Sequence, residues 1–187
     1  MQTLAPFGFR PAYHSTGLNR GVAYTIAGAY PVNIFKGDPV ILATTGVLIL
    51  GTVAADLLGI FNGVEYIDIT GKPTYSNFWP AGQTVQAGQA PTAYVLTDPN
   101  IIYDVQATGP VLQTAIGDQA DFVVGSGSTL TGLSTATLNA TLAGVGGLAQ
   151  FRIVDINRDP GNTVADPFTV VQVQLARSQF VANKVAV

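Results

Sequence analysis

The chain has no cysteine and a single histidine, His14, among its 187 residues. Without cysteine there is no disulfide framework, no thiol nucleophile and no thiolate metal site. A zinc site usually needs about three or four His or Cys ligands, so one imidazole leaves almost no way to build one. The fold must therefore depend on packing and hydrogen bonds, and we expect neither a metal nor a cofactor.

Charge is also scarce, because only 10% of the residues are Asp, Glu, Lys or Arg, against roughly 25% in an average soluble domain. Eight basic and eleven acidic residues give a net charge of −3, which offers no basic patch to the phosphates of a nucleic acid. The hydrophobic share of 48% excludes a disordered chain. Because a surface with so few charges tends to associate, we expect a homo-oligomer or a component of an assembly.

Long hydrophobic runs are absent as well. The apolar stretch Val40–Leu50 is interrupted by Thr and Gly, and it is far shorter than the roughly 20 residues that a membrane-spanning helix needs. The first residues lack the basic and apolar regions of a secretory signal. We therefore expect no membrane insertion and a protein that is used without processing.

What the chain has instead is Val, Thr, Ile, Tyr and Phe in short runs, separated by Gly, Pro, Asn and Asp at intervals typical of all-β proteins. Thr44–Gly46 lies between two such runs and predicts a hairpin, and Asp98–Asn100 predicts a turn between two more. The clearest strand is Phe168–Leu175, in which apolar residues alternate with glutamines. Ile116–Asp121 and Leu133–Leu142 do not fit the strand pattern, and each could hold a short helix.

These patterns predict an all-β fold, a single β-barrel or β-sandwich (jelly-roll-like) domain with little helix. We assign residues 21–187 to the β domain and residues 1–20 to an extended N-terminal arm. Pro6 and Pro11 disfavour a helix or a central strand in that arm.

Catalytic chemistry has little support in the sequence. Any Ser-His-Asp arrangement would have to use His14, which lies in a Pro- and aromatic-rich stretch and is better explained as an exposed or packed polar residue. Four of the eleven acidic residues precede a proline, as turn-forming aspartates do. The loop Asp155–Asp166 lacks EF-hand spacing, and no carboxylate pair is tied to a cleft. We expect that the protein is not an enzyme, while a weak calcium or glycan site stays open.

Aromatic residues concentrate in the N-terminal arm and in residues 75–80. Because aromatic residues anchor interfaces, we interpret the arm as a docking segment. Its positively charged Arg10, together with His14, would suit an acidic partner surface. The alternative is that the arm folds back over a strand edge of its own barrel. For Trp79 we favour a place in the core over one in an interface. The candidate contact residues are Phe7, Phe9, Arg10, Tyr13, His14, Tyr75, Phe78 and Trp79.

The opening motif Ala5–His14 resembles the start of structural proteins from tailed-phage virions. The same resemblance extends to Lys36–Val40, Gly63–Tyr66, Ser76–Pro80, Ile116–Phe122 and Arg177–Lys184. Within that lineage the nearest role is a capsid cement or decoration protein on an HK97-like shell. The resemblance implies a β-rich protein, made in the host cytoplasm, that lies on the capsid surface of the virion and stabilises contacts between capsomers. Its implied partners are the major capsid protein and further copies of itself, a homotrimer first and a dimer next, and it implies no active site.

Two alternatives remain open. One is another minor head or tail structural protein, which copy number in the particle would distinguish. The other is a carbohydrate- or receptor-binding β module, for which Tyr75 and Trp79 would form the platform.

Overall fold

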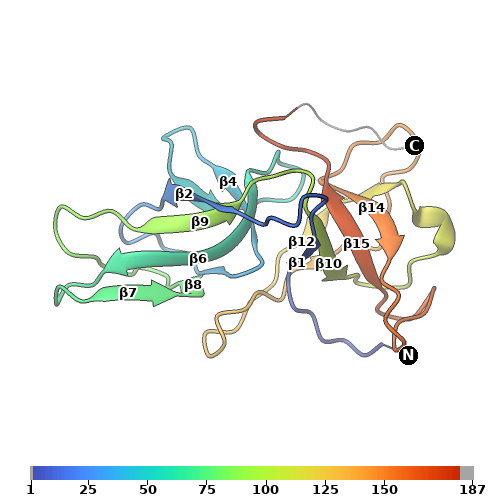
Figure 1. Cartoon of the computed structure of the whole chain (residues 1–187), viewed down its shortest axis with the longest axis horizontal. Coiled ribbons are helices and arrows are strands. Elements are labelled where there is room, and N and C mark those ends of the chain that lie inside the picture. The colour runs from blue at the N-terminus through green and yellow to red at the C-terminus, as the bar shows by residue number, and fades with distance from the viewer. Residues whose placement is uncertain (1, 182–187) are drawn as a thin grey trace.

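The computed structural model describes residues 2–181 and consists almost wholly of antiparallel strands (Figure 1). This confirms the predicted all-β class. The single helical element within residues 2–181 is the 3-10 turn η1, Gln113–Ala115. The last part of the Arg177–Lys184 motif, residues 182–184, lies outside the described residues.

The strands collect into two lobes that lie side by side along the long axis of the molecule (Figure 1). The β6 lobe contains β2 to β9, and the β15 lobe contains β1 and β10 to β15. The chain therefore begins in the β15 lobe, leaves it after β1, completes the β6 lobe and returns at β10. One cluster of buried apolar side chains lies within the β6 lobe, and a second lies in the β15 lobe and extends across the junction to Leu57, Ile60 and Leu96.

The β6 lobe is built on a sheet of order β2-β9-β6-β4-β5, with β7 paired to β6. Its strands are β2 (Gly21–Thr25), β4 (Pro39–Leu42), β5 (Leu48–Leu50), β6 (Gly59–Ile67), β7 (Pro73–Ser76) and β9 (Thr92–Leu96). The short strands β3 (Ile34–Phe35) and β8 (Phe78–Trp79) pair with each other. Leu42 lies opposite Leu48, which confirms the predicted hairpin around Thr44–Gly46.

The β15 lobe is built on a sheet of order β1-β10-β15-β14-β11. Its strands are β1 (Arg10–Tyr13), β10 (Ile102–Gln106), β11 (Gln119–Ala120), β14 (Phe151–Ile156) and β15 (Val170–Leu175), with a separate pair β12 (Phe122–Val123) and β13 (Thr137–Leu138). In β15 the side chains of Val171, Val173 and Leu175 are buried and the two glutamines are half-buried, as the alternating pattern predicts.

The N-terminal segment is extended, but it is part of the β15 lobe and does not stand away from it. β1 pairs antiparallel with β10, and Pro11 lies opposite Tyr103. β1 is an edge strand of its sheet, which is where a proline can be accommodated because it has no N–H to donate. The N-terminal segment therefore covers a strand edge of its own fold, which was the alternative to a free docking arm.

Two local expectations were wrong. Leu133–Leu142 contains strand β13, and Ile116–Asp121 contains strand β11, so neither holds a helix. The turn at Asp98–Asn100 is present, but the strands that it joins, β9 and β10, belong to different sheets. This turn is therefore a connection between the two lobes and not the turn of a hairpin.

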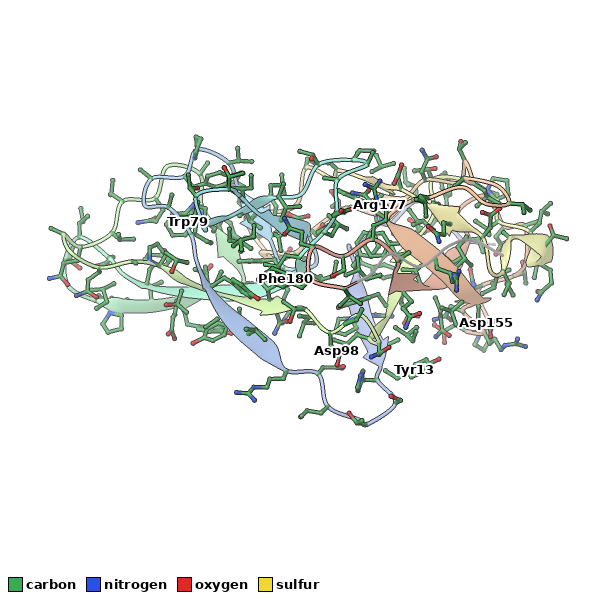
Figure 2. All side chains as sticks on the ribbon, turned by 90° about the horizontal axis from the view of Figure 1, so that it is seen from above. Tyr13, Trp79, Asp98, Asp155, Arg177 and Phe180 are labelled. Atoms are coloured by element: carbon green, nitrogen blue, oxygen red, sulfur yellow. The ribbon has the colours of Figure 1, made fainter. Side chains whose placement is uncertain are left out.

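Hydrogen bonds fix the two lobes to each other at their junction. The Arg177 side chain lies near the middle of the molecule (Figure 2), and its Nε donates to Asp56 Oδ1 at 2.8 Å. The buried Gln150 amide donates from Nε2 to the carbonyls of Thr52 and Ala55, each at 2.8 Å. The backbone N–H of Leu57 adds a bond to the Arg177 carbonyl at 3.1 Å.

Candidate interaction surface

The predicted contact residues of the N-terminal segment have different environments. Phe9 is only 1% exposed and stacks on Phe151 with ring centroids 4.3 Å apart, so its assignment to an exposed docking surface was wrong. Phe7 is half-buried, with the Arg10 guanidinium 4.9 Å above its ring. Arg10 also forms an ion pair with Asp104 at 3.4 Å. Among these residues Tyr13 is the one aromatic side chain that is well exposed.

His14 ties together the two segments that cross between the lobes. Its Nε2 lies 3.2 Å from Asp98 Oδ2, in the turn between β9 and β10. Its Nδ1 accepts a hydrogen bond from the Thr16 backbone N–H at 3.2 Å and lies 2.7 Å from the Thr16 hydroxyl oxygen. Tyr13 and Asp98 lie near each other at this edge of the molecule (Figure 2). The contacts with Thr16 close the turn after β1, and the contact with Asp98 joins that turn to the one between β9 and β10. They fit the interpretation of His14 as a packed polar residue.

The aromatic residues within positions 75–80 also differ in their exposure to solvent. Trp79 is 0% exposed, donates from Nε1 to the Tyr30 carbonyl at 3.3 Å, and meets the edge of Tyr66 at 5.6 Å. It lies inside the β6 lobe (Figure 2), which confirms the core assignment. Phe78 stacks on Phe35 at 5.4 Å. Tyr75 remains on the surface, 64% exposed.

Tyr75 shares a face of the β6-lobe sheet with residues that were not predicted from the sequence as contact residues. Glu65 on β6 lies directly opposite Tyr75 on β7 and opposite Thr92 on β9. Tyr94, two residues farther along β9, therefore shares this face. Its ring centroid lies 6.3 Å from that of Tyr75. The period-two pattern of Thr92–Leu96, with Ala93 and Val95 buried, could have identified Tyr94 as outward-facing.

The electrostatics of this face are dominated by Glu65. The nearby Glu65 carboxylate is the main reason why the pKa of Tyr94 is raised. A hollow of about 440 Å³ lies beside Glu65 and Tyr75, and Gln89 and Thr92 are also among the residues that line it. No lysine or arginine is among the residues that line it.

Exposed apolar side chains at loop tips form a second kind of surface. Leu130 is 94% exposed and Val145 is 91% exposed. Leu130 lies in the loop between β12 and β13, which runs across to the β6 lobe. A Cβ added at Gly127 would lie 2.1 Å from the Phe35 ring, and one at Gly132 would lie 2.7 Å from the Cβ of Asn77. Close packing at these glycines holds the loop against the β6 lobe and presents Leu130 to solvent.

The base of the same loop is fixed by a buried carboxylate. Asp38 Oδ2 accepts from the Phe35 N–H at 2.7 Å, and Oδ1 accepts from the Ser134 hydroxyl at 2.5 Å. Burial raises the pKa of Asp38 to about 6, although both hydrogen bonds oppose that shift. Asp38 thus joins the β6 lobe to the loop of the β15 lobe.

Within residues 2–181, no three His, Cys, Asp or Glu side chains are grouped so that they could hold a metal ion. The same part of the chain contains no helix with the length and apolarity needed to cross a bilayer. Comparisons with models of protein families, with curated proteins and with solved structures found no match to this chain.

Proposed function

We propose that this chain is a structural protein of a tailed-phage virion, a cement or decoration protein that binds the outer surface of an HK97-like shell and stabilises contacts between capsomers. The observation that carries the proposal is the presence of large apolar side chains, Leu130 and Val145 foremost, in full contact with solvent on a surface with few charges. A partner that covers such a side chain removes it from water, and full burial of one Leu or Val is worth about 1.5–3 kcal/mol. The resemblance of the sequence motifs to those of virion proteins supports the same role.

The partners that we propose are the major capsid protein and other copies of this chain. The Leu130 loop, held by close packing at Gly127 and Gly132, suits docking because little conformational entropy is lost when a rigid loop is covered. Weak contacts of this kind become strong when many copies bind one closed shell. Of the predicted contact residues, Tyr13 and Tyr75 remain suitable, whereas Phe9 and Trp79 are buried in the chain itself.

The test uses capsids of the parent phage from which this protein has been removed. Leu130→Asp is compared with Thr44→Asp, which introduces the same charge at an exposed turn of the β4–β5 hairpin. We expect wild type and Thr44→Asp to bind and protect the shells against dissociation, and Leu130→Asp to bind at least about tenfold more weakly. Equal binding by all three proteins would exclude the loop tip as the contact, and failure of wild type to bind would exclude the cement role.

Copy number distinguishes a cement protein from a minor head or tail component. A cement protein is present in hundreds of copies per particle and a tail component in a few, so quantitative mass spectrometry of purified particles separates them. The oligomer is a further part of the proposal, a homotrimer first and a dimer next. Sedimentation that shows only the 19.4 kDa monomer across the micromolar range would contradict it.

A carbohydrate-binding module is the second candidate function. The observation that favours it is the pair of tyrosine rings on the open face of the β6-lobe sheet. The platform expected from the sequence, Tyr75 with Trp79, is replaced by Tyr75 with Tyr94, because Trp79 is buried.

A further inference from the structure

We propose that the face of the β6-lobe sheet formed by Glu65, Tyr75, Thr92 and Tyr94 binds a neutral oligosaccharide. This inference stands on the geometry of that face and does not depend on the capsid role. We refer to these four residues as the tyrosine face.

The Tyr75 ring lies close to Gly63 of the neighbouring strand β6. Gly63, in β6 next to a register shift between Phe61 and Gly63, has a φ of 143°. A Cβ at Gly63 would lie 3.2 Å from the Tyr75 hydroxyl oxygen and 3.6 Å from Cζ. The phenol ring therefore leans across the strand, over the place where another residue would carry its side chain. Glycine at this position lets the ring lie along the sheet.

The Tyr94 side chain is placed in a similar way. A Cβ at Gly21, on the neighbouring strand β2, would lie 3.2 Å from the Tyr94 Cβ. The two tyrosine rings are tilted by 37° to each other, with centroids 6.3 Å apart. Two rings at this spacing can contact consecutive units of one oligosaccharide. The electron-rich face of an aromatic ring attracts the polarised C–H groups on the apolar side of a pyranose.

The polar groups of the tyrosine face fit the hydroxyl groups of a sugar. A carboxylate has about four acceptor positions, and Glu65 lies on the same face of the sheet as the two tyrosine rings. The hollow beside it also includes the Thr92 hydroxyl and the Gln89 amide. Binding sites of this kind combine apolar and aromatic walls with a few polar groups that fix orientation.

The negative charge of Glu65 favours an uncharged ligand over an acidic one. The lining of the hollow contains a carboxylate and no lysine or arginine, and the chain has a net charge of −3. An acidic sugar, a nucleotide or a phosphorylated ligand would meet repulsion without a compensating cation. A neutral sugar offers hydroxyl donors to Glu65 and an apolar face to the rings.

The experiment is an NMR titration of the full chain with cellohexaose, chitohexaose and mannohexaose, each up to about 10 mM, where millimolar affinities are measurable. Trigalacturonic acid serves as the acidic counterpart. We expect saturable amide shifts at Gly63, Tyr75 and Tyr94 with at least one neutral probe, and none with the acidic one. Absence of saturable shifts with all three neutral probes would overturn the proposal.

Variants locate the site and separate it from a merely structural effect. Tyr75→Ala and Glu65→Gln should each weaken binding of that probe about tenfold or more. The matched control, Tyr13→Ala, removes an exposed tyrosine from the β15 lobe and should leave the affinity unchanged. Unchanged affinity in Tyr75→Ala would refute the assignment, and so would a Tyr75→Ala protein that loses self-association while saccharide binding persists. Shell binding by Tyr75→Ala is measured separately, so failure here and failure of the capsid role are distinguishable.

Discussion

Replacing Asp38 with asparagine should change how the stability of the protein depends on pH. Asp38 is buried between the β6 lobe and the β12–β13 loop, and it accepts hydrogen bonds from Ser134 and from the Phe35 N–H. Loss of water around the carboxylate outweighs both bonds and raises its pKa to about 6, from an ordinary value of 3.8. The folded chain therefore keeps a proton on Asp38 at a pH where the unfolded chain has lost it.

The size of the effect follows from that difference in pKa. One pKa unit corresponds to about 1.4 kcal/mol, so a shift of roughly two units is equivalent to about 3 kcal/mol. Below about pH 4 the carboxyl is protonated in both states and costs nothing. As the pH rises through the window from about 4 to 6, the unfolded state releases the proton first, and the free energy of unfolding falls. Above the folded pKa the loss is complete and constant.

Asparagine removes the charge and keeps the shape of the side chain. Its amide oxygen can accept from the Phe35 N–H, and its amide nitrogen can donate to the Ser134 hydroxyl oxygen, which already accepts from the Ala136 N–H at 2.9 Å. The variant should therefore lack the decline between pH 4 and 6. The free energy of unfolding of the variant, relative to that of wild type, should rise by about 3 kcal/mol as the pH increases from 4 to 6.

Urea unfolding at about pH 4, 5, 6 and 7.5 measures this difference, with the fluorescence of Trp79, the sole tryptophan, as the probe. The pKa values of Asp68 and Asp166 are lowered by hydrogen bonds, so they stabilise the fold above their ordinary pKa and that stabilisation is lost in acid. They are present in both proteins, and their contribution cancels in the comparison. Parallel profiles for wild type and Asp38→Asn would refute the reasoning.

Three further substitutions test the packing. Phe9→Ala should lower the free energy of unfolding by about 3–5 kcal/mol, because it empties a fully buried site between Phe122 and Phe151; a thermal midpoint equal to wild type would show that the N-terminal segment is not part of the core. Gly127→Ala should cost about 2 kcal/mol or more in urea unfolding, since its Cβ would overlap the Phe35 ring at a φ of 63°. Arg177→Ala, by contrast, removes a partly exposed ion pair with Asp56 and should cost no more than about 1 kcal/mol; a larger loss would contradict the small contribution that we assign to this pair at the junction.

The strands of this protein were predictable where their pattern is local. Side chains in a strand alternate between two faces, so the run from Phe168 to Leu175 carries its own information, and the turn residues at Thr44–Gly46 define a hairpin between neighbours. No local sequence pattern predicts that β1 pairs with β10. Arg10 lies opposite Asp104, and nothing in either segment indicates a partner so far along the chain.

The candidate surface was predictable in part for the same reason. Tyr75 is exposed as a contact residue must be, but the candidate site around it depends on β6 and β9, which place Glu65 and Tyr94 beside it. Phe9 and Tyr13 are close in sequence and of the same chemical kind, yet one is in the core and the other in solvent. Composition could not separate them, because the separation depends on the position of Phe151 across the lobe.

The insertion of the β6 lobe between β1 and β10 has a consequence for synthesis on the ribosome. Translation releases Phe9 first, long before Phe122 and Phe151, against which it packs. The strands β2 to β9 are contiguous in the chain and can form their own sheet as soon as residue 96 has emerged. Because domains fold as units during synthesis, N-terminal units first, we expect the sheet of the β6 lobe to form while the aromatic N-terminal segment is still without its partners. The N-terminus of the chain would then be among the last parts to find its native place.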